Sequence, residues 1–231
     1  MRIDRGWLVA GFVPALLAGL LAPPAWAAVP LGGGSGITVN GTPCTLATIG
    51  HDRSGELVGL TSAHCGGPGA QVAADGAAGT VGTVESTNDG LDYALIKFDP
   101  ASVTPVANVD GFPINGIGGF PPGLFQPICG QSSATGHGCT NHVTAFPGWP
   151  ALDPASVYVG GCRNPADQGT PVTANDLLIG MVRNSGPPIT SLRCNFAFLP
   201  NGGICAEIVS IPAILDDLNA KGGPGAGFAP V

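Results

Sequence analysis

The chain has 231 residues, of which 44% are hydrophobic and only 10% are charged, and its formal net charge is -7. This composition excludes an intrinsically disordered protein, because a chain this long and this apolar can bury a substantial core in one or two domains. The net negative charge also excludes nucleic acid and anionic membrane surfaces as expected partners, since both repel an acidic surface.

The N-terminal segment has the parts of a secretory signal peptide. Arg2 and Arg5 precede an apolar run over residues 6–21, and Ala27 ends a small-residue cleavage site. The run of about 16 residues is shorter than the roughly 20 that span a bilayer, which argues against stable membrane insertion. We expect residues 1–27 to be removed, and the mature protein to be secreted or held in the cell envelope.

Short β-prone segments dominate the rest of the chain. They are rich in Val, Ile, Thr and Leu and are separated by clusters of Gly, Pro, Asn and Asp, a pattern typical of an all-β sandwich or barrel. In chain order these segments are residues 44–49, 57–62, 79–85, 93–98, 157–159, 177–182 and 204–211.

One segment near the C-terminus keeps a helical period. Ile214, Leu215 and Leu218 share a face, a proline stands in the first turn, and two glycines end the pattern. We therefore predict a short C-terminal helix over residues 212–221, followed by a flexible Gly/Pro-rich tail over residues 222–231.

Two motifs carry a histidine and an aspartate in that order. Leu60-Thr-Ser-Ala-His64-Cys65 is similar to the Thr-Ala-Ala-His-Cys motif of chymotrypsin-like serine proteases, and Leu91-Asp92-Tyr-Ala-Leu-Ile96 is similar to the segment that carries their catalytic aspartate. In that family the histidine moves a proton and the aspartate orients the imidazole. The resemblance implies that His64 and Asp92 are a retained catalytic pair.

A third motif follows, at residues 162–171. It is similar to the Cys-x-x-Pro-Gly-Asp-Ser-Gly-Gly-Pro loop of secreted bacterial members such as streptogrisins and alpha-lytic protease, but Gln168 stands at the position of the nucleophilic serine. A primary amide has no ionisable proton near neutral pH, so a histidine base cannot turn Gln168 into an attacking anion. Ala166 replaces the glycine whose N–H forms half of the oxyanion hole. The resemblance therefore implies a site whose nucleophile and oxyanion-hole positions, Ala166 and Gln168, are both altered.

The resemblance covers roughly residues 36–221 and implies the fold. We expect an all-β protein of two packed antiparallel six-stranded β-barrels, the chymotrypsin-like fold, with a short C-terminal helix. The domain would span residues 28–221, with lobes at about 36–110 and 111–211. The resemblance also implies three disulfides, which agree with an oxidising compartment: Cys44–Cys65, Cys129–Cys139 and Cys162–Cys194. Cys205, in the last strand, is then the odd thiol of seven, expected to be buried and inert.

The sequence does not identify the residue that pairs with Asp167. Its family counterpart is buried and needs a cationic partner, and in bacterial members this is an arginine where the present chain has Gly130-Gln131. Three arginines are candidates: Arg163, Arg183 and Arg193.

The strand that lines the substrate cleft in the family corresponds to residues 178–186, and it can be aligned with the family in two registers. In one register Arg183, and in the other Ser185, takes the place of a serine that touches the catalytic aspartate.

Three hydroxyl residues could be considered as substitute nucleophiles: Ser185, Thr170 and Ser62. We disfavour all three, because nucleophile and base must lie within about 3 Å, and Ser62 points away in the family pattern.

His137 and His142 flank Cys139, but no further ligand completes a metal site. We therefore expect surface histidines, no metal and no cofactor.

Three functions are compatible with these residues. The first is a monomeric, non-catalytic pseudoprotease that binds a protein or peptide ligand in the former cleft between the barrels. The alternative is an active secreted serine-type endopeptidase with an atypical nucleophile. The third is a structural envelope protein in which the His64–Asp92 pair persists through packing.

Overall fold

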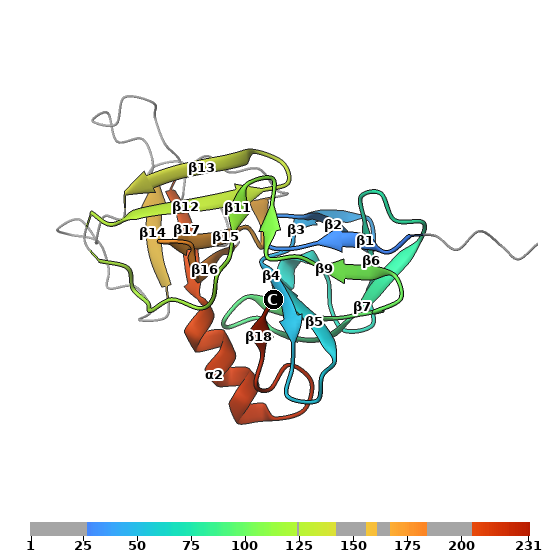
Figure 1. Cartoon of the computed structure of the whole chain (residues 1–231). Helices are drawn as coiled ribbons and strands as arrows, with labels where there is room; N and C mark the ends of the chain where they lie inside the picture. Colours follow the sequence, from blue (N-terminus) through green and yellow to red (C-terminus); the bar gives the residue numbers. More distant parts are fainter. Residues whose placement is uncertain (1–26, 124, 142–155, 161–166, 184–204) are drawn as a thin grey trace, which may run out of the picture.

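The computed structural model describes residues 27–123, 125–141, 156–160, 167–183 and 205–231. Within these ranges the chain forms two large antiparallel sheets that lie side by side, with the C-terminal helix α2 (Ile211–Lys221) beneath them (Figure 1). We call them the first and second lobes. This arrangement confirms the predicted all-β fold with a short C-terminal helix.

The first lobe is a sheet with the strand order β18-β4-β5-β8-β7-β6-β2-β3. Its strands are β2 (Gly36–Val39), β3 (Thr42–Thr45), β4 (Thr48–His51), β5 (Leu57–Thr61), β6 (Gln71–Ala74), β7 (Thr80–Asn88), β8 (Tyr93–Phe98) and β18 (Ala229–Pro230). Only Leu46 and Ala47 separate β3 from β4, although these two strands lie near opposite ends of the order. The sheet therefore curls so that its two sides meet, as a barrel requires. With β3 and β4 counted as one interrupted strand, the lobe has the six expected strands plus β18.

The second lobe is a six-stranded sheet with the order β13-β12-β15-β16-β17-β14. Its strands are β12 (Pro127–Ser132), β13 (Gly136–Asn141), β14 (Ser156–Gly160), β15 (Pro171–Ala174), β16 (Leu177–Arg183) and β17 (Cys205–Ser210). Five of its β-branched residues, Ile128, Val172, Ile179, Val182 and Ile208, form a buried core of their own. The segment between the lobes adds β9 (Val103–Pro105), β10 (Asn108–Val109) and β11 (Phe112–Pro113), and β9 pairs in parallel with β1 (Val29–Leu31).

A shared hydrophobic cluster fixes the lobes against each other. It joins Leu60 and Leu95 of the first lobe to Leu178 and Met181 of the second, and Ile214 of α2 packs into the same cluster. All five side chains are fully or almost fully buried. The two lobes and the helix thus form one packed unit, and residues of both lobes meet at fixed positions.

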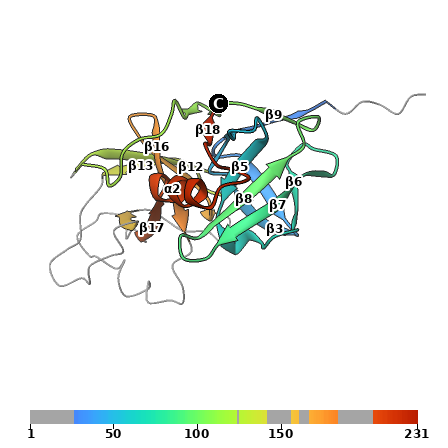
Figure 2. The same ribbon diagram turned by 90° about the horizontal axis from the view of Figure 1, so that it is seen from below.

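Helix α2 ends at Lys221, as the sequence predicts, and begins at Ile211, one residue before the predicted start. The Ser210 side chain caps its N-terminus by accepting a hydrogen bond of 3.2 Å from the Ala213 N–H, and Gly222 ends it. On its side facing the first lobe, the Asp217 carboxylate accepts hydrogen bonds from Tyr93 Oη (2.6 Å) and Asn88 Nδ2 (2.9 Å). Figure 2 shows the helix from below, beside β8.

The C-terminal tail differs from its predicted flexibility. Residues 229–230 form β18, which pairs with β4, and Phe228 is only 9% exposed within the shared hydrophobic cluster. The Gly225 N–H also donates to the buried carboxylate of Asp52 (3.1 Å). The prediction of a flexible tail was therefore wrong: its glycines adopt positive φ values that fold the chain back, and Phe228 gives it an apolar anchor.

The predicted signal peptide lies outside the described residues. No helix in the described part of the chain is long and apolar enough to cross a membrane.

Candidate active site

His64 lies in a short 3-10 turn, η1 (Ala63–Cys65), that directly follows β5. The turn is held in three ways. Ser62 caps it, since its hydroxyl accepts a hydrogen bond of 3.2 Å from the His64 N–H. The disulfide Cys44–Cys65 ties its last residue to β3, as expected. Thr61 Oγ1 donates to the carbonyl oxygen of Thr45 (2.8 Å), which joins the end of β5 to the same strand.

Asp92 stands one residue before β8 and is fully buried. It has a φ of 48°, a conformation that non-glycine residues adopt uncommonly and that aspartate tolerates better than most. Its Oδ1 lies 2.7 Å from Nδ1 of His64 and accepts a hydrogen bond of 2.8 Å from Ser62 Oγ. The structure therefore brings His64 and Asp92 into direct contact, as the motifs predict.

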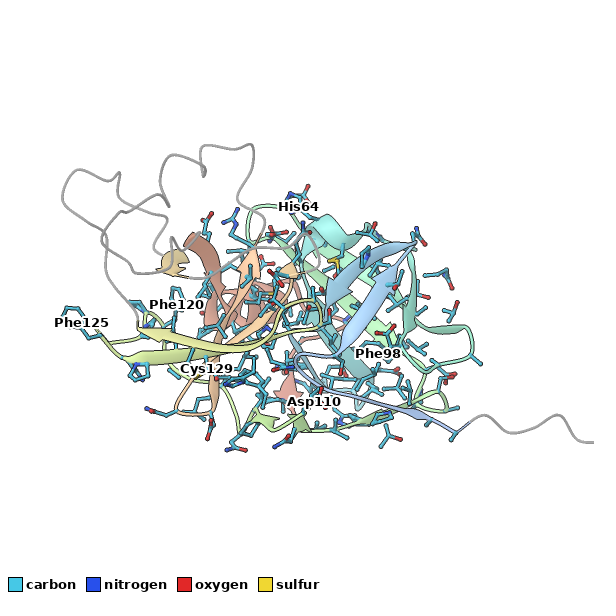
Figure 3. The ribbon with its side chains drawn as sticks, turned by 90° about the horizontal axis from the view of Figure 1, so that it is seen from above. His64, Phe98, Asp110, Phe120, Phe125 and Cys129 are labelled. Atoms are coloured by element: carbon cyan, nitrogen blue, oxygen red, sulfur yellow. A yellow bond between two sulfur atoms is a disulfide. The ribbon has the colours of Figure 1, made fainter. Side chains whose placement is uncertain are left out.

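The two members of this pair differ sharply in exposure. The His64 side chain is 45% exposed, whereas that of Asp92 is 0% exposed, and Figure 3 shows His64 at the surface of the molecule. A carboxylate acceptor at Nδ1 assigns the proton of the neutral ring to Nδ1. The other ring nitrogen, Nε2, has no hydrogen-bond partner among the described residues. The geometry thus presents an oriented imidazole that can accept a proton or a hydrogen bond at Nε2.

The loop that carries Gln168 lies against the His64 turn. The Gln168 carbonyl oxygen accepts a hydrogen bond of 3.0 Å from the Thr45 N–H, and the Gly169 N–H donates to the carbonyl oxygen of Val182 on β16 (2.9 Å). A β-carbon placed on Gly169 would lie 3.2 Å from the Ser62 nitrogen. The loop therefore bridges the two lobes beside His64.

The Gln168 side chain does not engage the imidazole. It is half-buried, and its Oε1 atom is buried without a hydrogen-bond partner in the part of the chain that the structure describes. Three other residues of the predicted site, Ala166, Cys162 and Cys194, lie outside the described residues, as does Ser185. Their roles, and those of His64, Asp92 and Gln168 in catalysis, stay predictions.

Asp167 is buried as expected, and two of its contacts are with hydroxyl groups. Its Oδ1 accepts a hydrogen bond from Ser132 Oγ and one of 3.0 Å from Thr135 Oγ1, both from the β12–β13 hairpin. Of the three candidate arginines, Arg183 instead lies with its Nη1 3.5 Å from a carboxylate oxygen of Glu207 on the adjacent strand β17. The other two, Arg163 and Arg193, lie outside the described residues.

The hairpin of β12 and β13 contains the second expected disulfide, Cys129–Cys139. His137 Nε2 lies 3.4 Å from Cys139 Sγ, and its ring packs edge-on against Phe112. The two sulfur atoms and a nitrogen of His137 lie within 4.8 Å of one another. Because the disulfide occupies both sulfurs, these three residues do not form a metal site in this state.

Sequence reasoning was wrong about the position of Ser62. The family pattern predicts that it points away from the site, yet its side chain is fully buried and contacts both His64 and Asp92. The signal in the sequence was a serine two residues before the histidine, where a hydroxyl caps a short helical turn.

The two curled sheets, the lobe-bridging loop and the His64–Asp92 pair define the chymotrypsin-like fold, and solved structures agree. The chain is similar to Nocardiopsis protease (TM-score 0.61, 20% identity, 83% of this chain and 97% of that one). It is also similar to Thermobifida fusca protease A (TM-score 0.61, 16% identity, 83% and 97%). A third match is the chymotrypsin of Cellulomonas bogoriensis (TM-score 0.57, 21% identity, 83% and 97%).

These likenesses establish that the chain has the fold of bacterial chymotrypsin-like serine proteases. No protein-family model and no curated protein sequence matches the chain.

Proposed function

We propose that this chain is an exported, non-catalytic relative of the chymotrypsin-like serine proteases that binds a protein or peptide ligand beside His64. One observation carries the proposal: Gln168 occupies the loop that bridges the lobes beside an assembled His64–Asp92 pair. The base is in place, and the residue it would activate is an amide. Loss of the nucleophile lowers turnover by about 10⁶ in a well-studied serine protease.

Two of the substitute nucleophiles are unsuited to that role. The hydroxyl of Ser62 donates to Asp92 and accepts from the His64 backbone, and the residue has no exposed surface. Thr170 is 6% exposed and immediately precedes β15. Neither hydroxyl is accessible to a substrate carbonyl, which supports the non-catalytic part of the proposal.

The preserved pair argues against a purely structural role. A buried carboxylate that is held by a half-exposed histidine and a buried serine costs desolvation energy, which packing alone does not require. An imidazole with Nε2 available can instead accept a hydrogen bond from a bound ligand. We therefore place His64 in the ligand-contacting surface.

The test uses the purified mature protein, a fluorophosphonate probe and a broad peptide library. We expect neither covalent labelling nor cleavage, and we expect retention of a subset of peptides that His64→Ala weakens. His51→Ala is the matched control, because His51 is also exposed but lies on β4 and forms no contact with Asp92. Labelling or cleavage that disappears in His64→Ala would overturn the proposal.

The second candidate is an active serine-type endopeptidase with an atypical nucleophile. The contact between His64 and Asp92 at 2.7 Å supports it, since the pair has the arrangement of a working general base. Ser185 is the residue to test. Loss of a measured cleavage activity in Ser185→Ala, with the fold retained, would favour this candidate over the binding role.

A further inference from the structure

Ser62 is a fully buried serine whose hydroxyl links the two members of the His64–Asp92 pair. Its Oγ donates to Asp92 Oδ1 (2.8 Å) and accepts from the His64 N–H (3.2 Å). The same Oδ1 atom is 2.7 Å from His64 Nδ1. The Ser62 hydroxyl therefore contacts the Asp92 carboxylate and also the backbone of His64, the residue whose ring that carboxylate binds.

This arrangement gives the hydroxyl an orienting role. The single proton of the hydroxyl is directed at Asp92. The hydroxyl therefore lies on the side of the imidazole that carries Nδ1. A nucleophile would instead have to reach Nε2. A hydrogen bond to a carboxylate is stronger than a typical hydrogen bond between neutral groups. Ser62 is thus able to hold the Asp92 carboxylate in a single orientation.

The whole linked set belongs to the first lobe. Ser62 follows the last residue of β5 and Asp92 precedes the first residue of β8, and these strands pair with Thr61 opposite Ala94. The register of two adjacent strands therefore sets the distance between the serine and the aspartate. The contact between Ser62 and Asp92 is consequently made within the lobe that carries the pair.

We propose that Ser62 is a positioning residue of the His64–Asp92 pair. By fixing the Asp92 carboxylate, it holds the neutral ring of His64 in the tautomer that carries the proton on Nδ1, so that Nε2 remains the acceptor. This inference is independent of the proposed function, because an oriented base serves a ligand-binding site and a hydrolytic site alike.

The test is NMR of the His64 ring in selectively ¹⁵N-labelled mature protein at pH 9. We expect the native ring to show one Nδ1–H tautomer and a slowly exchanging Nδ1 proton. In Ser62→Ala, exchange of that proton should accelerate about tenfold or more, which corresponds to the loss of a hydrogen bond to a charged group, and both tautomers should appear. Asp92→Asn should give the same change or a larger one.

The matched control is Ser102→Ala. Ser102 also donates its hydroxyl to an aspartate, Asp99, over 2.7 Å, but at an exposed position far along the chain from His64. It should leave the His64 signals unchanged. If Ser62→Ala fails to fold, Ser62→Cys and Ser62→Thr replace it: the weak thiol donor should lose the single tautomer, and the threonine hydroxyl should keep it. A native tautomer and native exchange rate in folded Ser62→Ala or Ser62→Cys would overturn the inference.

Discussion

The backbone of Gly169 is packed against the carbonyl oxygen of Thr45 so closely that no side chain fits between them. A β-carbon at Gly169 would lie 2.2 Å from that oxygen and 2.4 Å from Thr61 Oγ1. Gly169 also has a φ of 82°, in the region that favours glycine. This contact sets the Gln168 loop against the strands that carry the His64 turn.

Gly169→Ala is expected to lower the free energy of unfolding by much more than backbone strain alone would. Gly41→Ala separates the two effects, because Gly41 has a similar φ of 87° but no atom within 4 Å of its would-be β-carbon. Strain alone costs about 1–2 kcal/mol. Urea unfolding should show a larger loss for Gly169→Ala than for Gly41→Ala. Equal losses would mean that the loop moves away from Thr45 without cost.

Gln168→Ser alone is expected not to restore robust proteolysis. The substitution supplies a nucleophile, but Ala166 still stands where the family has a glycine. Alanine keeps the backbone N–H, yet its β-carbon restricts the backbone conformations that can aim this N–H at an oxyanion. An oxyanion-hole donor that is out of place costs up to about 10²–10³ in turnover, the cost of removing one. Cleavage of a peptide library and fluorophosphonate labelling measure the outcome, with the double variant Ala166→Gly/Gln168→Ser beside it. Turnover above about 1 s⁻¹, a usual enzyme rate, by the single variant would contradict this expectation.

The contact between Asp217 and Tyr93 is expected to make stability depend on pH at both extremes. Burial raises the pKa of Asp217, but hydrogen bonds from Lys221, Tyr93 and Asn88 outweigh it and hold the pKa below its usual value. The ionised Asp217 therefore stabilises the fold above about pH 3.9, the pKa of aspartate in the unfolded chain. This contribution is lost as the pH falls through the pKa of Asp217 in the folded protein.

Burial and the hydrogen bond to Asp217 raise the pKa of Tyr93. A raised pKa stabilises the fold below about pH 10 and the contribution is lost as the pH rises through the folded value. Asp217→Asn should flatten both limbs of a curve of unfolding free energy against pH. Asp216→Asn, on the exposed side of the same helix, is the control. Identical curves for the two variants would show that the contact does not contribute.

Phe228→Ala is expected to lower the free energy of unfolding by about 3 kcal/mol, the cost of removing a buried phenylalanine side chain. The reason is that Phe228 is 9% exposed within the cluster that joins the lobes and helix α2. Phe125→Ala is the matched control, because Phe125 is 66% exposed and should change stability little. Chemical unfolding of both variants measures the difference. A tail that frays in solution would give the two substitutions similar, small effects.

Sequence reasoning reached the fold because its signals are local or are set by motif order. The period of apolar residues located helix α2, and the order of His64, Asp92 and the 162–171 loop indicated the arrangement of the lobes. Contacts across strands were harder to predict. The hydrogen bond from Ser62 to Asp92 depends on the register of β5 with β8. The hydroxyl groups that contact Asp167 come from a hairpin more than thirty positions earlier in the chain.

The prediction of a flexible C-terminal tail was wrong for a different reason. A run rich in glycine and proline has the composition of a linker, and composition does not report that a single aromatic residue reaches a core. Phe228 supplies that anchor, and the intervening glycines supply the tight turns.

The final strand, β18, also ends the first sheet. Ala229 and Pro230 lie opposite His51 and Gly50, so β18 covers the side of β4 that would otherwise present free N–H and C=O groups. Open strand edges of this kind recruit strands from other molecules, and a short strand that contains proline is a poor template for them. Residues 229–230 therefore make this side of β4 a poor docking edge for a strand of another molecule.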